Sequence, residues 1–101
     1  MSAFASAASL AAELHAAVLA VQRAMALQSV AAAGLQLLLA AHAEGLGGVW
    51  VCSPLFAQET IRRTLDLPAS WEPQGMFFLG VPDGNPKARD RKDIREVSLF
   101  L

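Results

Sequence analysis

The sequence has little of what stabilises small secreted domains or binds nucleic acids. Its single cysteine, Cys52, excludes a disulfide within the chain and is typical of a protein in a reducing cytoplasm. Tyrosine is absent, aromatic residues make up only 7% of the chain, and the net charge is −1. That charge lacks the basic excess of a nucleic-acid-binding protein. We therefore expect a cytoplasmic protein with no nucleic-acid partner.

The chain also lacks a convincing membrane or secretion signal. Its first ten residues carry none of the positive charge with which a secretory signal peptide begins. Residues 24–43 are uncharged throughout, which is long enough to cross a bilayer. Polar residues nevertheless interrupt this stretch, namely Gln28, Ser29, Gln36 and His42, and alanine contributes little to insertion. We expect no membrane-spanning helix here.

Charge is scarce in the first half of the chain, where alanine takes its place. Only Glu13, Arg23 and Glu44 are charged among the first 44 residues, and most alanines precede Gly45. No internal repeat or linker is visible, so residues 1–101 are expected to form a single domain. A small chain that is 54% hydrophobic is typical of a protein that hides part of its surface in a partner subunit.

Residues 9–44 are predicted to form a helix, either continuous or in two parts with a break near residues 21–24. Ala, Leu, Gln, Met and Glu dominate this region, and all are strong helix formers. Because apolar side chains occupy most of its circumference, we expect the helix to be buried. Gly34 costs about 1 kcal/mol relative to alanine in a helix, so we expect another backbone to pack closely against it.

The end of this helix and the next element are marked by local signals. Gly45 is placed to close the last turn in a left-handed conformation, with Leu46 as the accompanying hydrophobic contact. Residues 49–52 form a short apolar run that predicts a buried strand. Ser53 followed by Pro54 predicts a helix N-cap with proline in the first turn.

The remaining elements complete an α+β fold. Residues 58–67 predict a second helix, which Pro68 ends. Residues 74–81 are apolar apart from Gln74 at their start, as in a strand covered on both faces. Eight of the ten residues in 87–96 are charged, and residues 97–101 are again apolar. We expect this apolar tail to dock on another surface.

Several short segments between Arg23 and Val97 together resemble the C-terminal half of the nitroreductase-like flavoproteins. The resemblance is greatest to the small FMN domain attached to ligases of deazaflavin-cofactor biosynthesis. The segments keep the family's order and spacing and are residues 25–33, 37–42, 45–50, 54–56, 71–73, 79–82 and 87–92. The resemblance implies a nitroreductase-like half domain, in which a long buried helix packs on a small sheet and the N-terminal half of the fold is absent.

The resemblance also implies an activity and an assembly. Members of this family dimerise through long helices, which correspond here to residues 9–44, and hold two FMN molecules at the dimer interface. Both subunits contribute to each site. The implied reaction transfers hydride from NAD(P)H through the flavin to a nitro, quinone or ene acceptor. In such an enzyme the flavin carries the chemistry, while the protein binds and orients it.

The resemblance places one group of site residues beside the isoalloxazine ring. By position these are Trp50, Val51, Cys52 and Ser53, with a backbone amide near Cys52 facing the hydride-accepting nitrogen. Such a role requires a backbone N–H and a flat apolar surface rather than a particular side chain. A nucleophilic role for Cys52 is the alternative, but no histidine lies near it in the sequence, which favours a packed thiol.

A second group matches the cations that bind the FMN phosphate in this family. It consists of Lys87, Arg89 and Arg91, and the resemblance favours one of the two arginines as the phosphate ligand. Arginine suits this role because its planar fork pairs with two phosphate oxygens. Composition alone instead favours a solvated loop of mixed charge, and that alternative stays open. We predict no metal site.

The family's N-terminal half has no counterpart in this chain. That half supplies an Arg-Arg-Ser-x-Arg type segment that grips the phosphate and the strands that flank the sheet, whereas residues 1–22 contain Glu13 as their only charge. Two hypotheses follow. The chain is part of an FMN oxidoreductase, completed by a homodimer partner or by a second polypeptide that supplies the missing half. Alternatively, it is a non-catalytic helical dimerisation module without flavin.

Overall fold

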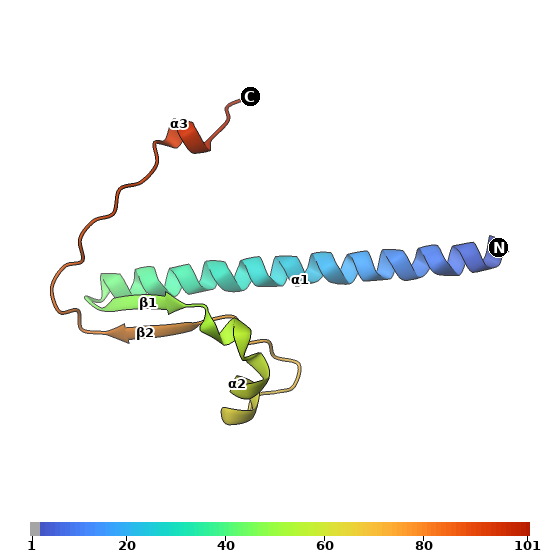
Figure 1. The fold of residues 1–101 in the computed structure, drawn as a ribbon, viewed down its shortest axis with the longest axis horizontal. Coiled ribbons are helices and arrows are strands. Elements are labelled where there is room, and N and C mark those ends of the chain that lie inside the picture. The colour runs from blue at the N-terminus through green and yellow to red at the C-terminus, as the bar shows by residue number, and fades with distance from the viewer. Residues whose placement is uncertain (1–2) are drawn as a thin grey trace.

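The computed structural model describes residues 3–101, and side chains from Ser6 onward. Its longest element is helix α1 (Ala3–Ala43), about 61 Å long at 1.5 Å per residue (Figure 1). The helix runs without the break that was one alternative for residues 21–24. It is continuous because no proline occurs within it and the first glycine is Gly34.

The end of α1 has the backbone geometry that the sequence predicted. Gly45 adopts a φ of 81°, the left-handed conformation that glycine adopts without steric cost. The N–H of Leu46 donates to the carbonyl of Ala41 at 2.8 Å, and the N–H of Gly45 donates to that of His42 at 3.0 Å. These two bonds define a Schellman cap. The cap reverses the chain, so the next strand runs back beside α1 (Figure 1).

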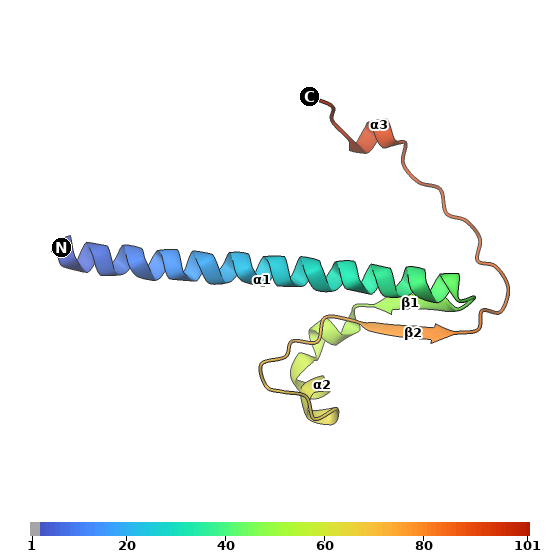
Figure 2. The same cartoon turned by 180° about the vertical axis from the view of Figure 1, so that it is seen from behind.

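Two strands form the sheet, β1 (Gly47–Val51) and β2 (Met76–Gly80). They pair antiparallel, with Gly47 opposite Gly80 and Val51 opposite Met76. Figures 1 and 2 show this pair of strands, called the hairpin below, beside the C-terminal part of α1. The N-terminal part of the helix extends past every other element drawn. The sheet and helix together confirm the predicted α+β class.

The two strands are covered on one face only. Successive side chains in a strand point to opposite faces, so Trp50 and Phe77 share the face toward α1, while Val49 and Phe78 share the other. Val49 is 52% exposed and Phe78 is 57% exposed. The prediction that residues 74–81 are covered on both faces is therefore wrong within this chain. Their continuous apolar run reflects one packed face and one uncovered apolar face.

At Gly34 the sheet approaches α1 closely. The rings of Trp50 and Phe77 lie with their centroids 5.1 Å apart and tilted by 48°. A Cβ atom at position 34 would lie 2.7 Å from Cζ of Phe77 and 3.1 Å from Cη2 of Trp50. The expected close approach at Gly34 exists, but two aromatic side chains of the same chain make it. The prediction of another backbone at this position is wrong for the contacts in this chain.

Helical segments connect the strands. The 3₁₀ helix η1 (Ser53–Phe56) follows β1, and Cys52 occupies its cap position without a side-chain hydrogen bond, so the predicted Ser53 cap is wrong. Helix α2 (Gln58–Thr64) ends before the predicted residue 67. Its end is set by Asp66, which has a φ of 52°, and by the N–H of Leu67, which donates to the carbonyl of Arg62 at 2.8 Å. This backbone cap precedes Pro68.

Beyond β2 the chain leaves the sheet and contains one short helix, α3 (Ile94–Val97) (Figure 1). The carboxylate of Asp93 caps it by accepting a hydrogen bond from the N–H of Arg95 at 2.8 Å. The apolar tail remains exposed: Leu99 and Phe100 each keep 82% of their surface. The predicted docking of this tail does not occur within a single copy of the chain.

A single copy buries very little of its surface. The chain exposes 9070 Å², whereas a compact monomer of 10.7 kDa exposes about 5,500 Å². Its radius of gyration is 20.7 Å, against about 13 Å for a compact domain of this length. Most of α1 is exposed, so the expected burial of this helix is not achieved within one chain. The reason is geometric, because two short strands cover only its C-terminal part.

By length and composition, α1 also meets the requirements for crossing a membrane, over Ser6–Ala43. A helix that packs in a protein interior or interface meets the same requirements.

Candidate functional site

The four residues predicted beside a flavin ring lie at the end of β1, where the sheet gives way to η1. Trp50 is directed toward α1, and the indole Nε1 atom is buried. Val51 lies half-buried on the opposite face, and Cys52 and Ser53 are exposed. The four residues therefore lie together at one edge of the sheet, but their side chains point in different directions. Trp50 is positioned to hold the hairpin on α1 rather than to contact a ligand on the outer face.

The backbone at this edge offers hydrogen-bond donors. Cys52 has φ −92° and ψ 0°, a sparsely populated conformation in which many active-site residues are found. The first amides of a helical segment have no partner within it, and Pro54 has no N–H at all. The amide of Ser53 therefore remains as a donor at the start of η1, next to the exposed Cys52.

Beside this edge lies the uncovered outer face of the hairpin. Its side chains are Val49, Val51, Met76 and Phe78, which form cross-strand pairs through the register of the sheet. All four are apolar, and Met76 keeps 41% of its surface exposed. The residues present thus fit one side of a flat aromatic ring system such as an isoalloxazine. The second side of such a ring would require another surface.

The predicted phosphate-binding cations lie at the opposite end of the sheet. Because Gly47 pairs with Gly80, the chain beyond β2 departs from the end at which β1 begins (Figure 1). The length of β1 places that end about 14 Å from Val51. Lys87, Arg89 and Arg91 are exposed, and none of the three forms an ion pair or hydrogen bond within residues 3–101. The structure does not bring the two predicted groups together within one copy.

A hollow of about 550 Å³ lies at the same end of the sheet as these cations. The end of α1, the glycine-rich turn and the loop leading to Lys87 form its walls. Its lining residues include His42, Gly45, Gly48, Pro82 and Asn85. Sequence reasoning did not find this hollow, since its walls come from two segments that are distant in the sequence, residues 38–48 and 82–86, and neither carries a binding motif. His42 is the one titratable side chain in its lining.

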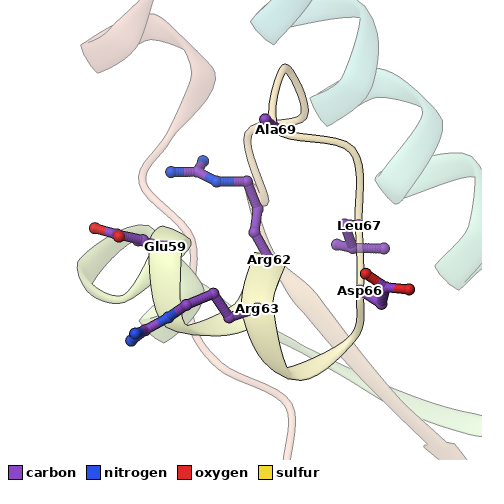
Figure 3. A pocket seen from close by; sticks show the side chains of 6 residues that line it. All are labelled: Glu59, Arg62, Arg63, Asp66, Leu67 and Ala69. Atoms are coloured by element: carbon purple, nitrogen blue, oxygen red, sulfur yellow. The ribbon is translucent and has the colours of Figure 1, made fainter.

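Another hollow, of about 400 Å³, lies against α2 and contains the arginines of that helix. Figure 3 shows Arg62 directed toward the loop that carries Ala69, and Arg63 directed away from it. Nη1 of Arg62 donates to the carbonyl of Trp71 at 3.0 Å, so this arginine holds the loop. Glu59 and Asp66 add negative charge to the same lining. This hollow contains none of the predicted site residues.

No metal centre is evident in the part of the chain that the structure describes. Within it, no three His, Cys, Asp or Glu side chains are grouped so that they could hold a metal ion.

Sequence reasoning also missed the surroundings of Trp50. Nε1 of Trp50 is buried and has no hydrogen-bond partner among the described residues. A Cβ atom at Gly75 would lie 2.7 Å from this nitrogen, so Gly75 leaves the space that the indole occupies. Together with Gly34, this glycine lets the indole lie between α1 and the segment that enters β2. No local signal could have linked positions 34, 50 and 75 because they are distant in the sequence.

Comparison with known proteins identifies the fold family. The model of the nitroreductase family matches residues 4–81, which contain β1, η1, α2, β2 and all of α1 except its first residue. A protein of Methanothermobacter thermautotrophicus with the provisional name NADH dehydrogenase/NAD(P)H nitroreductase is 39% identical over 74 residues. That alignment covers 71% of this chain and 39% of the relative, so the chain spans less than half of the relative's length. The chain belongs to the nitroreductase family.

Proposed function

We propose that this chain is part of an FMN-dependent oxidoreductase that passes hydride from NAD(P)H to a nitro, quinone or ene acceptor. One observation carries the proposal most directly. Within the matched residues 4–81, the flat apolar face of the hairpin ends at the exposed Cys52 and Ser53. The relative's name, which contains NAD(P)H nitroreductase, supports the same reaction class.

In this proposal the outer face of the hairpin supports the isoalloxazine ring. Val49 and Val51 supply apolar contact, and the amide of Ser53 donates a hydrogen bond at the ring edge. A flavin held there would supply the hydride-transfer chemistry, and the residues of this chain would bind and orient it. Trp50 acts indirectly by fixing the hairpin against Gly34.

The phosphate of FMN requires positive charge, since an unpaired buried phosphate is costly. Lys87, Arg89 and Arg91 supply that charge, and one of the two arginines is the bidentate ligand. Their lack of partners among the described residues supports this role, because no internal ion pair must break first. The hollow beside residues 82–86, which directly precede these cations, gives space for the phosphate end of a flavin.

A complete site requires a second chain, because the outer face contacts only one side of a ring. A homodimer formed through α1 is the proposed source of that surface, and a second polypeptide that supplies the missing half of the fold is the other source. The protein is proposed to act in the cytoplasm, without a nucleic-acid or membrane partner.

The alternative function is a helical dimerisation module that binds no flavin. The observation that favours it is the separation of the two predicted groups at opposite ends of the hairpin in one copy. In that case Lys87, Arg89 and Arg91 belong to a solvated loop, and α1 is the functional part of the chain.

A flavin titration separates the two functions. Purified protein is titrated with FMN and with riboflavin, which lacks the phosphate, while flavin fluorescence is followed. We expect the Arg89→Glu/Arg91→Glu variant to lose FMN affinity and to keep most of its riboflavin affinity. Arg63→Glu is the control, because Arg63 is exposed on α2 and outside the proposed site.

Two results would contradict the proposal. Equal FMN affinity in wild type and double variant would place the phosphate elsewhere. Absence of FMN binding by the wild-type protein would refute the oxidoreductase function for this chain and support the dimerisation module.

A further inference from the structure

The segment that enters β2, residues 71–75, lies across Trp50 and is called the strap below. Gly75 at its end lies against the indole, since a Cβ atom at this position would be 2.7 Å from Nε1. That nitrogen is buried and has no hydrogen-bond partner among the described residues. A buried donor without an acceptor costs free energy that contact with water would recover. The strap thus keeps Trp50 in a state that its opening would relieve.

Side chains from two helices hold the strap in place. From α2, Arg62 and Gln58 donate hydrogen bonds to two carbonyls of the strap, at 3.0 and 2.8 Å. From α1, Arg23 forms an ion pair with Glu72 of the strap. The strap is therefore fixed to both helices by polar bonds at or near the surface, and water and salt can compete with these bonds.

Packing adds little to these bonds, because hollows border the strap on two sides. A hollow of about 190 Å³ lies between it and α1, where Ala26, Leu27 and Val30 line the helix side. Another of about 470 Å³ lies between the strap and α2, with Ile61 and Leu65 on the helix side. Segments with few buried contacts and exposed bonds open locally at low cost. The strap can therefore move without breaking a packed core.

We propose that the strap opens and closes over Trp50 as one unit, and that the ion pair between Arg23 and Glu72 holds it closed. The two side chains of this pair are 55% and 43% exposed, so the pair is weak and sensitive to salt. In the closed state the pair and the bonds from α2 are formed. In the open state these bonds are lost, but water reaches Nε1 of the indole. Because the two sets of interactions oppose each other, a small change at the ion pair shifts the balance.

Opening of the strap reaches the candidate site through the register of the sheet. Val51 pairs with Met76, so Gly75 lies one position beyond this pair, across from Cys52. A closed strap fixes the edge of the sheet at which Ser53 offers its amide, and an open strap releases it. This effect on the ring edge rests on the proposed function, whereas the movement of the strap does not.

Exchange of the Trp50 indole proton with water, followed by NMR on the full chain without flavin, tests the movement. This proton should exchange when the strap opens, more slowly than that of the exposed Trp71. Arg23→Ala should speed the exchange at Trp50 about two-fold, which is the effect of one exposed ion pair. The charge swap Arg23→Glu/Glu72→Arg should restore the wild-type rate. Arg63→Ala is the matched control, because the Arg63 side chain forms no ion pair or hydrogen bond within residues 3–101.

A double variant tests whether the strap moves as one unit. Arg62→Ala removes the bond from α2 to the carbonyl of Trp71. If all the bonds break in one step, the Arg23→Ala/Arg62→Ala variant should speed exchange at Trp50 by the product of the two single effects. A double variant no faster than the faster single variant would contradict opening as a unit. High salt should reduce the difference between wild type and Arg23→Ala.

Four results would overturn the proposal. The Trp50 indole could exchange as fast as that of Trp71 in the wild type, or only as slowly as the backbone amides of β1, which report unfolding of the whole hairpin. Arg23→Ala could leave the rate unchanged, or the charge swap could stay as fast as Arg23→Ala.

The outcome is separate from that of the proposed function, since the measurement needs no flavin. A protein that binds no FMN but shows the expected exchange would keep this inference and lose the proposed function. A protein that binds FMN but whose Trp50 indole exchanges freely would have the opposite effect.

Discussion

The two ends of α1 have nearly the same composition and very different surroundings. The C-terminal part, around Gly34 and Ala41, packs on the hairpin and contains the most buried positions of the helix. The N-terminal part is just as rich in alanine and aliphatic residues but is exposed from Ser6 to the middle of the helix, where Arg23 pairs with Glu72. Apolar composition thus shows that a surface needs covering but does not show what covers it.

What distinguishes the packed part is one missing side chain. Gly34 lets Trp50 and Phe77 reach the helix backbone, whereas the exposed part presents a side chain at every position. Substitutions in the packed part should therefore destabilise the hairpin at any protein concentration. Substitutions of exposed apolar residues in the uncovered part of α1 should act through association and depend on concentration.

The largest effect is expected from Trp50→Ala. This change removes the ring that joins the sheet to α1 and should lower the free energy of unfolding by about 3 kcal/mol. Urea unfolding followed by circular dichroism at two protein concentrations measures it, and the loss should be the same at both. The control is Trp71→Ala, at a side chain that is 58% exposed, for which we expect less than about 1 kcal/mol. Equal losses would show that the ring contact does not hold the hairpin.

Gly34→Leu should have the next largest effect. Its side chain would occupy the space of Phe77 and Trp50, and overpacking of this kind costs about 2 kcal/mol. The neighbouring Ala33→Leu introduces the same side chain at an exposed position and should leave the hairpin intact. The chemical shifts of the Trp50 indole report the change. A stabilised Gly34→Leu variant would mean that the rings do not pack on this glycine.

A smaller effect is expected from Gly45→Ala. The φ of 81° at this position is unfavourable for alanine, so the Schellman cap should weaken by about 1 kcal/mol. Gly80→Ala is the control, because no atom lies within 4 Å of a Cβ built there and its φ is not in the left-handed region. Thermal unfolding compares the two variants, and a larger loss in Gly80→Ala would contradict the cap.

The smallest effect concerns the ion pair between Arg23 and Glu72, which ties the middle of α1 to the loop before β2. Both side chains are about half exposed, and exposed pairs contribute about 0.5 kcal/mol. A double-mutant cycle with Arg23→Ala and Glu72→Ala should give a coupling of this size that decreases at high salt. A coupling that is large and insensitive to salt would mean that the pair is shielded from solvent, as at an interface.

Local signals in the sequence predicted local structure well. Gly45 and Leu46 were identified as a helix cap because the cap involves only the preceding turn. Gly34 was recognised as a point of close approach, but the neighbours assigned to it were wrong, because they come from two strands distant in the sequence. The prediction that both faces of the second strand are covered was wrong for a related reason. A continuous apolar run such as residues 74–81 does not show how many of its faces another element covers.

The prediction of the candidate site depended on family resemblance more than on local sequence patterns. Cys52 and Ser53 carry no motif of their own, and their role beside a flavin stays a prediction. Whether Trp50 points toward α1 or away from it depends on which residues of β1 face the helix. A strand whose side chains are all apolar does not reveal this. The hollow beside His42 could not be predicted because two segments that are distant in the sequence form it. The family match ends at residue 81, so the roles of Lys87, Arg89 and Arg91 also stay predictions.

The packing of Trp50 has an optical consequence. The chain has two tryptophans and no tyrosine, so its intrinsic ultraviolet fluorescence comes from Trp50 and Trp71. Trp50 is shielded against Phe77 and its indole N–H lacks an acceptor, whereas Trp71 faces water. The emission spectrum should therefore contain a short-wavelength component from the hairpin and a long-wavelength component from the loop before β2. A yellow chromophore on the outer face of the sheet would quench the short-wavelength component by energy transfer, so one spectrum would report folding and occupancy together.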